Sequence, residues 1–155
     1  MISISFATPA DTPLILSLIR ELAEYEKLSH EVKTTEEDLS RSLFGEKPEA
    51  EVLLAFVNSE AAGFCLFFHN YSTFLSRKGL YIEDAYVRPD YRGQGVGRAL
   101  FRACAQIAKE RNCGRMEWWV LDWNAPALHF YEKLGAEAMR DWTVHRLTSE
   151  QFDTV

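Results

Sequence analysis

The sequence predicts an α/β (α+β) domain built on one mixed sheet, and three observations support this class. Apolar runs with strand character occur at 52–57, 62–68 and 80–87. A helical pattern then separates the third run from another at 116–121, which is the order of a β-α-β crossover with parallel flanking strands. A length of 155 residues suits one domain with its own core, so we expect a single domain over residues 1–155.

The N-terminal part of the chain predicts one strand followed by two helices. Apolar residues alternate with serine over 2–6, which indicates a strand. After a capping segment, Thr8-Pro9-Ala10-Asp11, apolar residues recur at helical spacing from Leu14, so a helix is expected to about Leu28. Thr35-Glu36-Glu37-Asp38 resembles a capping box and begins a second helix, which Gly45 is expected to end.

The remaining elements follow from turn residues and periodicity. Asn58-Ser59-Glu60 connects the first two apolar runs as a hairpin, and the polar stretch His69–Gly79 is expected to be a loop. Pro89 ends the third run because proline cannot donate to a ladder. The later elements expected are a helix at 97–107 broken at 112–114, a strand at 116–121, a helix at 125–134 ended by Gly135, and a strand at 142–147.

Composition narrows the classes of function. The chain carries 17 Lys+Arg against 23 Asp+Glu, a formal net charge of −6, which disfavours non-specific nucleic-acid binding and favours cationic partners. Cys65, Cys104 and Cys113 form neither an even disulfide set nor a zinc pattern, which is typical of a reducing compartment. No signal peptide or apolar stretch of ~18 residues is present. We expect a soluble, cytoplasmic protein with no metal, nucleic-acid or membrane partner.

A glycine-rich segment is the sharpest chemical feature. Arg92-Gly93-Gln94-Gly95-Val96-Gly97-Arg98 lies between a predicted strand and a predicted helix, with Arg88 and Arg102 nearby. The first amides of a helix lack intrahelical partners and lie at its positive end, so this segment predicts a phosphate site. Its spacing is neither that of dinucleotide folds nor that of a nucleotide P-loop, and the alternative is a turn that only caps a helix.

This segment resembles a known motif. Residues 87–97, Val-Arg-Pro-Asp-Tyr-Arg-Gly-Gln-Gly-Val-Gly, are similar to the acetyl-coenzyme A motif of the GNAT superfamily of N-acetyltransferases. Asn124-Ala125-Pro126-Ala127 and residues 130–136 resemble the second half of that family's site. A narrower resemblance, to the diamine (spermidine/spermine) branch that includes enzymes acting on thialysine-like amino acids, rests on segments 21–26, 44–48, 81–84 and 123–126.

The resemblance implies a fold, a co-substrate and a set of binding residues. The fold would be a GNAT-like mixed, mostly antiparallel sheet with helices on both faces and a β-α-β core that binds acetyl-coenzyme A (acetyl-CoA). Acetyl-CoA would be the co-substrate, and no metal is implied. The coenzyme would contact Ala85, Tyr86, Val87, Arg92, Gly93, Gln94, Gly95, Val96, Gly97, Arg98, Asn124, Ala125, Pro126, Ala127, Tyr131 and Leu134.

The reaction needs a base for the amine and a proton donor for the departing thiolate. The resemblance implies Glu83 as a water-linked base and Tyr131 as general acid, with a backbone amide near Val87 for the oxyanion. The alternatives are a strand-end acid in solvent for Glu83 and a buried core tyrosine for Tyr131. Glu83 and Asp84 are adjacent on a strand, so they point to opposite faces and form no dyad unless a bulge intervenes.

The resemblance also implies a small cationic amine as substrate, either a diamine or polyamine or an aminoalkyl amino acid. Many acids between residues 21 and 51 would form an attracting rim or merely a solvated surface, and Arg140 would disfavour a long polyamine. Competing hypotheses are acetylation of an amino sugar or a protein N-terminus, and a non-catalytic acyl-CoA sensor. A homodimer is expected. The substrate contacts would be Tyr25, Glu26, Glu83, Asp84, Glu117, Trp118 and Trp119, although each tryptophan could instead serve packing.

Overall fold

The computed structural model describes residues 1–155, and the backbone falls into two compact units. The first unit, Met1–Trp119, contains the sheet and three α-helices. The second unit, Val120–Val155, contains one α-helix and a short 3-10 helix. No helix combines the length and the apolar character that crossing a membrane requires.

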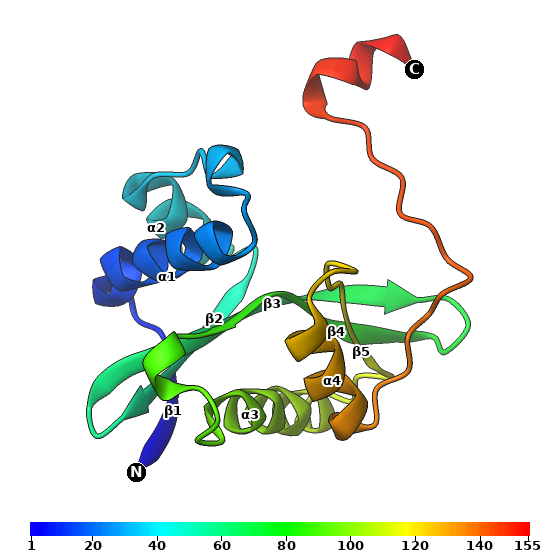
Figure 1. The fold of residues 1–155 in the computed structure, drawn as a ribbon. Coiled ribbons are helices and arrows are strands. Elements are labelled where there is room, and N and C mark those ends of the chain that lie inside the picture. The colour runs from blue at the N-terminus through cyan, green and yellow to red at the C-terminus, as the bar shows by residue number, and fades with distance from the viewer. The chain divides into compact units, whose positions relative to one another are not determined.

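The first unit is organised around a five-stranded mixed sheet (Figure 1). Its spatial order, β1-β2-β3-β4-β5, is also the chain order. The first four strands are antiparallel, and β5 pairs parallel to β4, as the predicted crossover requires. The strands are β1 (Ile2–Phe6), β2 (Glu51–Val57), β3 (Glu60–Ser72), β4 (Arg77–Val87) and β5 (Met116–Trp118).

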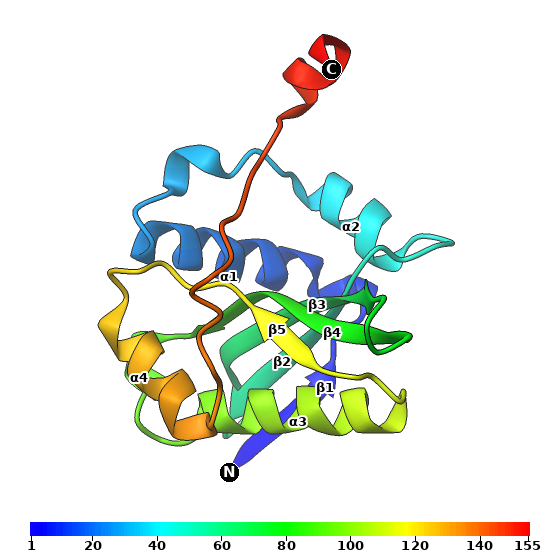
Figure 2. The same cartoon turned by 90° about the vertical axis from the view of Figure 1, so that its right-hand side faces the viewer.

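Helices cover both faces of this sheet (Figure 2). On one face, α1 (Thr12–Tyr25) and α2 (Glu36–Phe44) bury a continuous apolar core. On the other face lies α3 (Val96–Glu110), whose Cys104 places its sulfur 3.4 Å from that of Cys65 in β3. The predicted fold class is therefore confirmed. The core under α1 and α2 consists of Ile15, Leu16, Leu18, Leu22, Leu39, Leu43, Val52, Leu54, Phe64, Leu66 and Tyr86.

The first helix ends earlier than predicted. It stops at Tyr25 because Lys27 adopts a left-handed backbone conformation with φ of 61°. The amide of Leu28 then donates to the carbonyl of Ala23, five residues earlier, at 2.8 Å, and the amide of Lys27 donates to the carbonyl of Glu24 at 3.1 Å; these are the two bonds of a Schellman motif. The prediction of a helix to Leu28 is wrong, since periodicity did not reveal this turn. The motif leaves Glu26 at the very end of the helix.

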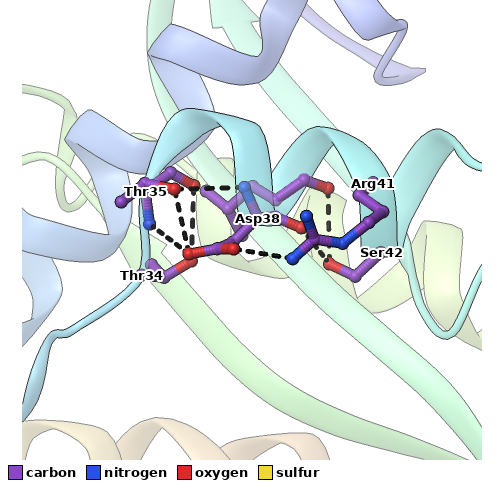
Figure 3. Close-up of polar contacts among 6 residues, drawn as sticks. Thr34, Thr35, Asp38, Arg41 and Ser42 are labelled. Carbon is purple, nitrogen blue, oxygen red and sulfur yellow. Dashed lines mark hydrogen bonds and ion pairs between the residues drawn. The ribbon is translucent and has the colours of Figure 1, made fainter.

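The second helix begins with the predicted capping box (Figure 3). The amide of Asp38 donates to Thr35 Oγ1 at 3.1 Å, and the Thr35 amide donates to Asp38 Oδ2 at 3.3 Å. Arg41 Nη2 donates to the other oxygen of Asp38 at 2.7 Å. Gly45 follows the helix as predicted, but with φ of −74° it is not left-handed. Glycine fits there because a Cβ would collide with the carbonyl oxygen of Arg41.

Two hairpins join β2, β3 and β4. The first turns through Asn58 and Ser59, both with positive φ, which confirms the predicted turn. The second is longer than expected, because β3 continues to Ser72 and β4 begins at Arg77. The predicted loop over 69–79 is therefore mostly paired strand, and the prediction is wrong there. The side chains over 69–79 are mostly polar because this end of the hairpin is exposed, and polar composition predicted a loop although the two backbones pair.

A β-bulge interrupts the pairing of β3 with β4. Leu66 lies opposite Asp84 and Phe67 lies opposite Ile82, so Glu83 has no partner. Before the bulge Ile82 shares its face with Phe67, and after it Asp84 shares its face with Leu66. Leu66 belongs to the core under α1 and α2, so the bulge places Asp84 on that face.

The crossover helix and the second unit complete the structure. α3 ends at Glu110, and the left-handed Asn112 that follows lies within the break expected over 112–114. β5 covers only 116–118 and is shorter than predicted.

In the second unit α4 (Ala125–Leu134) is confirmed, with Gly135 left-handed after it, and a 3-10 helix covers Ser149–Thr154. The strand predicted at 142–147 is wrong: the side chains alternate, but no strand pairs with this backbone.

Candidate active site

The glycine-rich loop presents an uncapped helix start. Gly93 and Gly95 have φ of 74° and 91°, and Gly95 is the N-cap of α3. The first helical bond runs from the Ala99 amide to the Gly95 carbonyl, so the amides of the first turn precede it. No side chain caps this end, and the first turn contains no acid. These amides can therefore donate hydrogen bonds to a bound anion, as the phosphate prediction requires.

The arginines around this loop differ in their availability. Arg88 is already bound to Glu21 from α1, at 2.7 Å between Nη2 and Oε1. Arg92 donates from Nε to the carbonyl of Val87 at 2.8 Å. Arg98 and Arg102 are exposed on α3. Of the four arginines in and near the segment, two are thus exposed and two are engaged with the protein itself.

Arg92 also closes one side of a small cavity. Its guanidinium carbon lies 4.9 Å from the ring centroid of Tyr25 and 5.6 Å from that of Tyr86. Tyr25 comes from the end of α1 and Tyr86 from β4, so the cavity lies between these elements. It has a volume of about 240 Å³ and is lined by Glu21, Glu24, Tyr25, Tyr86, Pro89 and Arg92.

One edge of β4 is partly unpaired. Parallel pairing with β5 is confined to Leu80, Tyr81 and Ile82. Past Ile82, only β3 pairs with β4, through contacts that include Ala85 with Cys65 and Val87 with Gly63. The strand predicted to bind the pantetheine arm therefore keeps a backbone edge without a strand neighbour. Backbone N–H and C=O groups on that edge would form hydrogen bonds with the amides of a ligand, as they would with a further strand.

Three acids converge beside the bulge. Burial, together with the nearby Glu83 and Glu26 carboxylates, raises the pKa of Asp84 to about 7. Burial also raises the pKa of Glu26 at the end of α1. No ion pair joins any of the three to a basic side chain. The sequence predicts that Glu83 and Asp84 form a dyad only if a bulge intervenes, and the structure contains that bulge. The charge of Glu83 contributes to the raised pKa of Asp84.

The acidic rim expected over 21–51 is only partly free. Ion pairs with arginine hold three of its acids, and His30 Nε2 lies 3.4 Å from Oε1 of a fourth, Glu31, whereas Glu26 has no ion pair. No group of three or more His, Cys, Asp or Glu side chains has the arrangement of a metal site. The paired acids are Glu21 with Arg88, Asp38 with Arg41, and Glu51 with Arg111.

The two consecutive tryptophans face opposite sides, as expected for a strand. Trp118 packs against Phe101 of α3 with ring centroids 5.0 Å apart. Trp119 lies against Tyr81 at 6.1 Å and is 60% exposed. Trp118 thus has a packing role, whereas Trp119 is available to a ligand. The neighbouring Glu117 accepts from Arg115 Nε at 3.0 Å.

The second unit carries the other predicted residues on α4. Asn124 Oδ1 accepts from the amide of Ala127 at 3.3 Å, so Asn124 serves as the N-cap, with Ala125 and Pro126 in the first turn. Tyr131 is half-buried later in the helix, with its ring 5.6 Å from that of Phe130. Leu134 ends the helix.

Sequence reasoning missed two aromatic residues near the acids. Phe68 and Tyr81 face each other across β3 and β4 with ring centroids 5.0 Å apart. Phe68 was hidden in an apolar run that predicted only a strand. Tyr81 could have been noticed, because it begins the segment Tyr81-Ile82-Glu83-Asp84.

Comparisons with known proteins agree with this architecture. The Acetyltransferase (GNAT) family profile matches residues 15–136. A thialysine N-epsilon-acetyltransferase from Bos taurus is 40% identical, over 93% of this chain and 91% of the relative. An L-ornithine N5-acetyltransferase from Arabidopsis thaliana is 32% identical, over 98% of this chain and 86% of the relative. The chain therefore belongs to the GNAT family, and it is an acetyltransferase.

Solved structures share the fold. An integron cassette protein from the mobile metagenome of V. cholerae superimposes with a TM-score of 0.81 at 23% identity, covering 99% of this chain and 96% of that one. A metagenomic aminoglycoside acetyltransferase has a TM-score of 0.78 at 21% identity, covering 96% and 95%. At these identities the likeness supports the architecture alone.

Proposed function

We propose that this chain transfers an acetyl group from acetyl-CoA to a primary amine of a small cationic substrate, a diamine or an aminoalkyl amino acid. One observation carries the proposal. A single strand, β4, leads into an uncapped, glycine-rich helix start and carries an acid pair without a cationic partner. The first feature suits a diphosphate and the second suits an ammonium.

The coenzyme would be held along β4 and the loop after it. The amides of Gly93 to Arg98 would receive the diphosphate, and the unpaired edge of Ala85, Tyr86 and Val87 would receive the pantetheine arm. When bound, acetyl-CoA supplies an acetyl thioester that an uncharged amine can attack. The absence of an acid from the first turn of α3 favours this fit, because a carboxylate there would repel phosphate.

The amine would be deprotonated at the bulge. An ammonium has a pKa near ~10.4, so it must lose a proton before it can attack. Glu83 is the proposed water-linked base, and Asp84, whose pKa of about 7 lies near neutral pH, would share this role. Glu26 would hold the substrate's positive charge from the end of α1, with Tyr25 beside it.

Tyr131 is the proposed proton donor for the departing thiolate. A thiol has a pKa near ~8.5 and a phenol near ~10, so the transfer is feasible. The family profile spans both units up to residue 136, which supports their acting together as one domain. We also propose a homodimer, as expected for this branch of the family.

The test is thiol release from acetyl-CoA with a panel of amines. The panel contains diamines, polyamines, lysine-like amino acids, an amino sugar and a peptide with a free N-terminus. Wild type is compared with Tyr131→Phe, Glu83→Gln and Asp84→Asn, with Tyr71→Phe on exposed β3 as a control. We expect release with small cationic amines and roughly 100-fold slower turnover in at least two of the three site variants.

Each alternative has a distinct result. A protein that binds acetyl-CoA but releases no thiol with any amine would be a sensor. Turnover confined to the amino sugar or the peptide would replace the substrate class. Equal rates in all variants would remove the proposed residue roles while leaving the family unchanged.

A further inference from the structure

Three aromatic rings form a cluster on the sheet next to the acids. Tyr81 of β4 lies opposite Phe68 of β3, and their ring centroids are 5.0 Å apart. Trp119, just after β5, meets the Tyr81 ring edge-on at 6.1 Å and an interplanar angle of 86°. Trp119 is exposed and the other two rings are half-buried, so the cluster remains open to solvent.

The cluster shares its face with Asp84. Phe68 and Leu66 are two residues apart on β3, so their side chains point to the same side. Leu66 lies opposite Asp84, and Phe68 lies opposite Tyr81. The bulge at Glu83 causes this arrangement, because without it Tyr81 and Asp84 would alternate to opposite faces.

The charges around the cluster favour a cation. Burial, Glu83 and Glu117 together raise the pKa of Tyr81 to about 12, so its ring stays neutral. Glu117 is already compensated by Arg115 at 3.0 Å, and Asn70 Nδ2 reaches the same oxygen at 3.5 Å. Glu83 has no such basic partner. Aromatic faces beside an uncompensated carboxylate attract ammonium groups.

The spacing along the sheet sets the length of the ligand. Two residues of strand separate the positions opposite Asp84 and Tyr81, which is roughly 7 Å. An extended aliphatic chain built from ~1.5 Å single bonds covers this distance with about four or five carbons between two nitrogens.

We propose that Phe68, Tyr81 and Trp119 form a subsite for the second, non-reacting ammonium group of the substrate, about four or five carbons from the amine that is acetylated. This inference rests on the proposed function and adds to it a selection for chain length. Trp119 and Tyr81 would supply the ring faces, while Glu83 keeps its proposed role as the water-linked base for the amine that reacts. A monoamine of equal length would not use the subsite.

The experiment is a chain-length series under steady-state conditions with saturating acetyl-CoA. Linear α,ω-diamines and the matching n-alkylamines are compared in wild type, Trp119→Ala, Tyr81→Leu and Tyr81→Phe. We expect kcat/KM to peak at about four or five carbons for the diamines. Trp119→Ala and Tyr81→Leu should lower that peak roughly 5- to 30-fold through KM, while Tyr81→Phe retains it. The loss with the monoamines should be smaller, because an alkylamine brings no second charge to the rings. Phe74→Ala, an exposed ring in the β3–β4 turn, is the control.

The outcomes separate the subsite from the function. A flat chain-length profile, or equal losses with diamines and monoamines in Trp119→Ala, would overturn the subsite while leaving acetyl transfer intact. Absence of transfer to any amine in the wild type would overturn the proposed function, and the subsite with it. Trp119 is on the surface, so its variant is expected to fold, and circular dichroism checks this.

Discussion

The guanidinium of Arg88 grips the carboxylate of Glu21 through two nitrogens, Nη2 to Oε1 at 2.7 Å and Nε to Oε2 at 3.0 Å. These residues are 67 positions apart, and their contact ties α1 to the end of β4. Arg88 Nη1 donates in addition to the carbonyl of Ala61 at 3.0 Å. The contact therefore fixes the helix that carries Tyr25 and Glu26 against the strand that carries Asp84.

Breaking this ion pair should destabilise the fold in a pH-dependent way. Hydrogen bonding from Arg88 lowers the pKa of Glu21 below its unfolded value. A lowered carboxyl pKa contributes stability above the unfolded value near 4.5, and this stability is lost as pH falls through the folded pKa. Glu21→Gln should cost roughly 1–3 kcal/mol at pH 7, and the cost should shrink below about pH 4. Urea unfolding at both pH values measures it, and a cost independent of pH would contradict the assignment.

Arg92 should matter for the coenzyme rather than for the amine. Its Nε donates to the carbonyl of Val87, and its charge lies beside the glycine loop. Arg92→Ala should weaken coenzyme A binding roughly 10-fold or more in calorimetry, because a phosphate partner is lost. Lys109→Ala, at the far end of α3, removes the same charge as a control. The effect should vanish with pantetheine, which lacks the diphosphate, and an equal loss there would contradict this role.

Replacing Gly95 with a residue that has a side chain should lower both stability and coenzyme affinity. With φ of 91° it holds the backbone that aims the first amides of α3, and a Cβ would be strained in this conformation. Gly95→Ala should cost about 1–2 kcal/mol of stability and also lower coenzyme affinity. Gly135→Ala, at φ of 86° after α4, is the matched control, with a similar stability loss and unchanged affinity. Equal affinities in both variants would remove the loop from the binding site.

The ionisation of Asp84 should affect the pH dependence of both stability and activity. Its folded pKa of about 7 lies above the unfolded value, so the protein should lose stability as pH rises from about 4 to 7. Asp84→Asn should therefore be more stable than wild type at pH 8, by roughly 1–3 kcal/mol, and equal to it near pH 4. In kcat/KM the wild type should show an ascending limb near pH 7 that the variant lacks. An unchanged limb would assign the proton transfer to another group.

Much of this fold could be predicted because its signals are local. Turn and cap residues such as Thr35, Asn58 and Gly135 act within a few positions of themselves, and each was located correctly. The glycine loop was also predictable, since a strand, glycines and a helix follow one another directly. By contrast, the end of α1 depends on Lys27 adopting a left-handed conformation, which a lysine in the sequence does not predict.

The arrangement of the acids could not be predicted in the same way. Whether Glu83 and Asp84 share a face depends on the register between β3 and β4, which distant residues determine. The engagement of Arg88 by Glu21 is a long-range contact of the same kind. A strand pattern at 142–147 likewise says nothing about whether a pairing partner exists.

The most direct measurement is the mass of the amine product formed from acetyl-CoA and a short diamine by wild-type protein. The account predicts one acetyl group on one primary nitrogen for every thiol released, with a large loss in Asp84→Asn and Tyr131→Phe. Thiol release that leaves the diamine unmodified, with the acetyl group recovered as acetate, would contradict it.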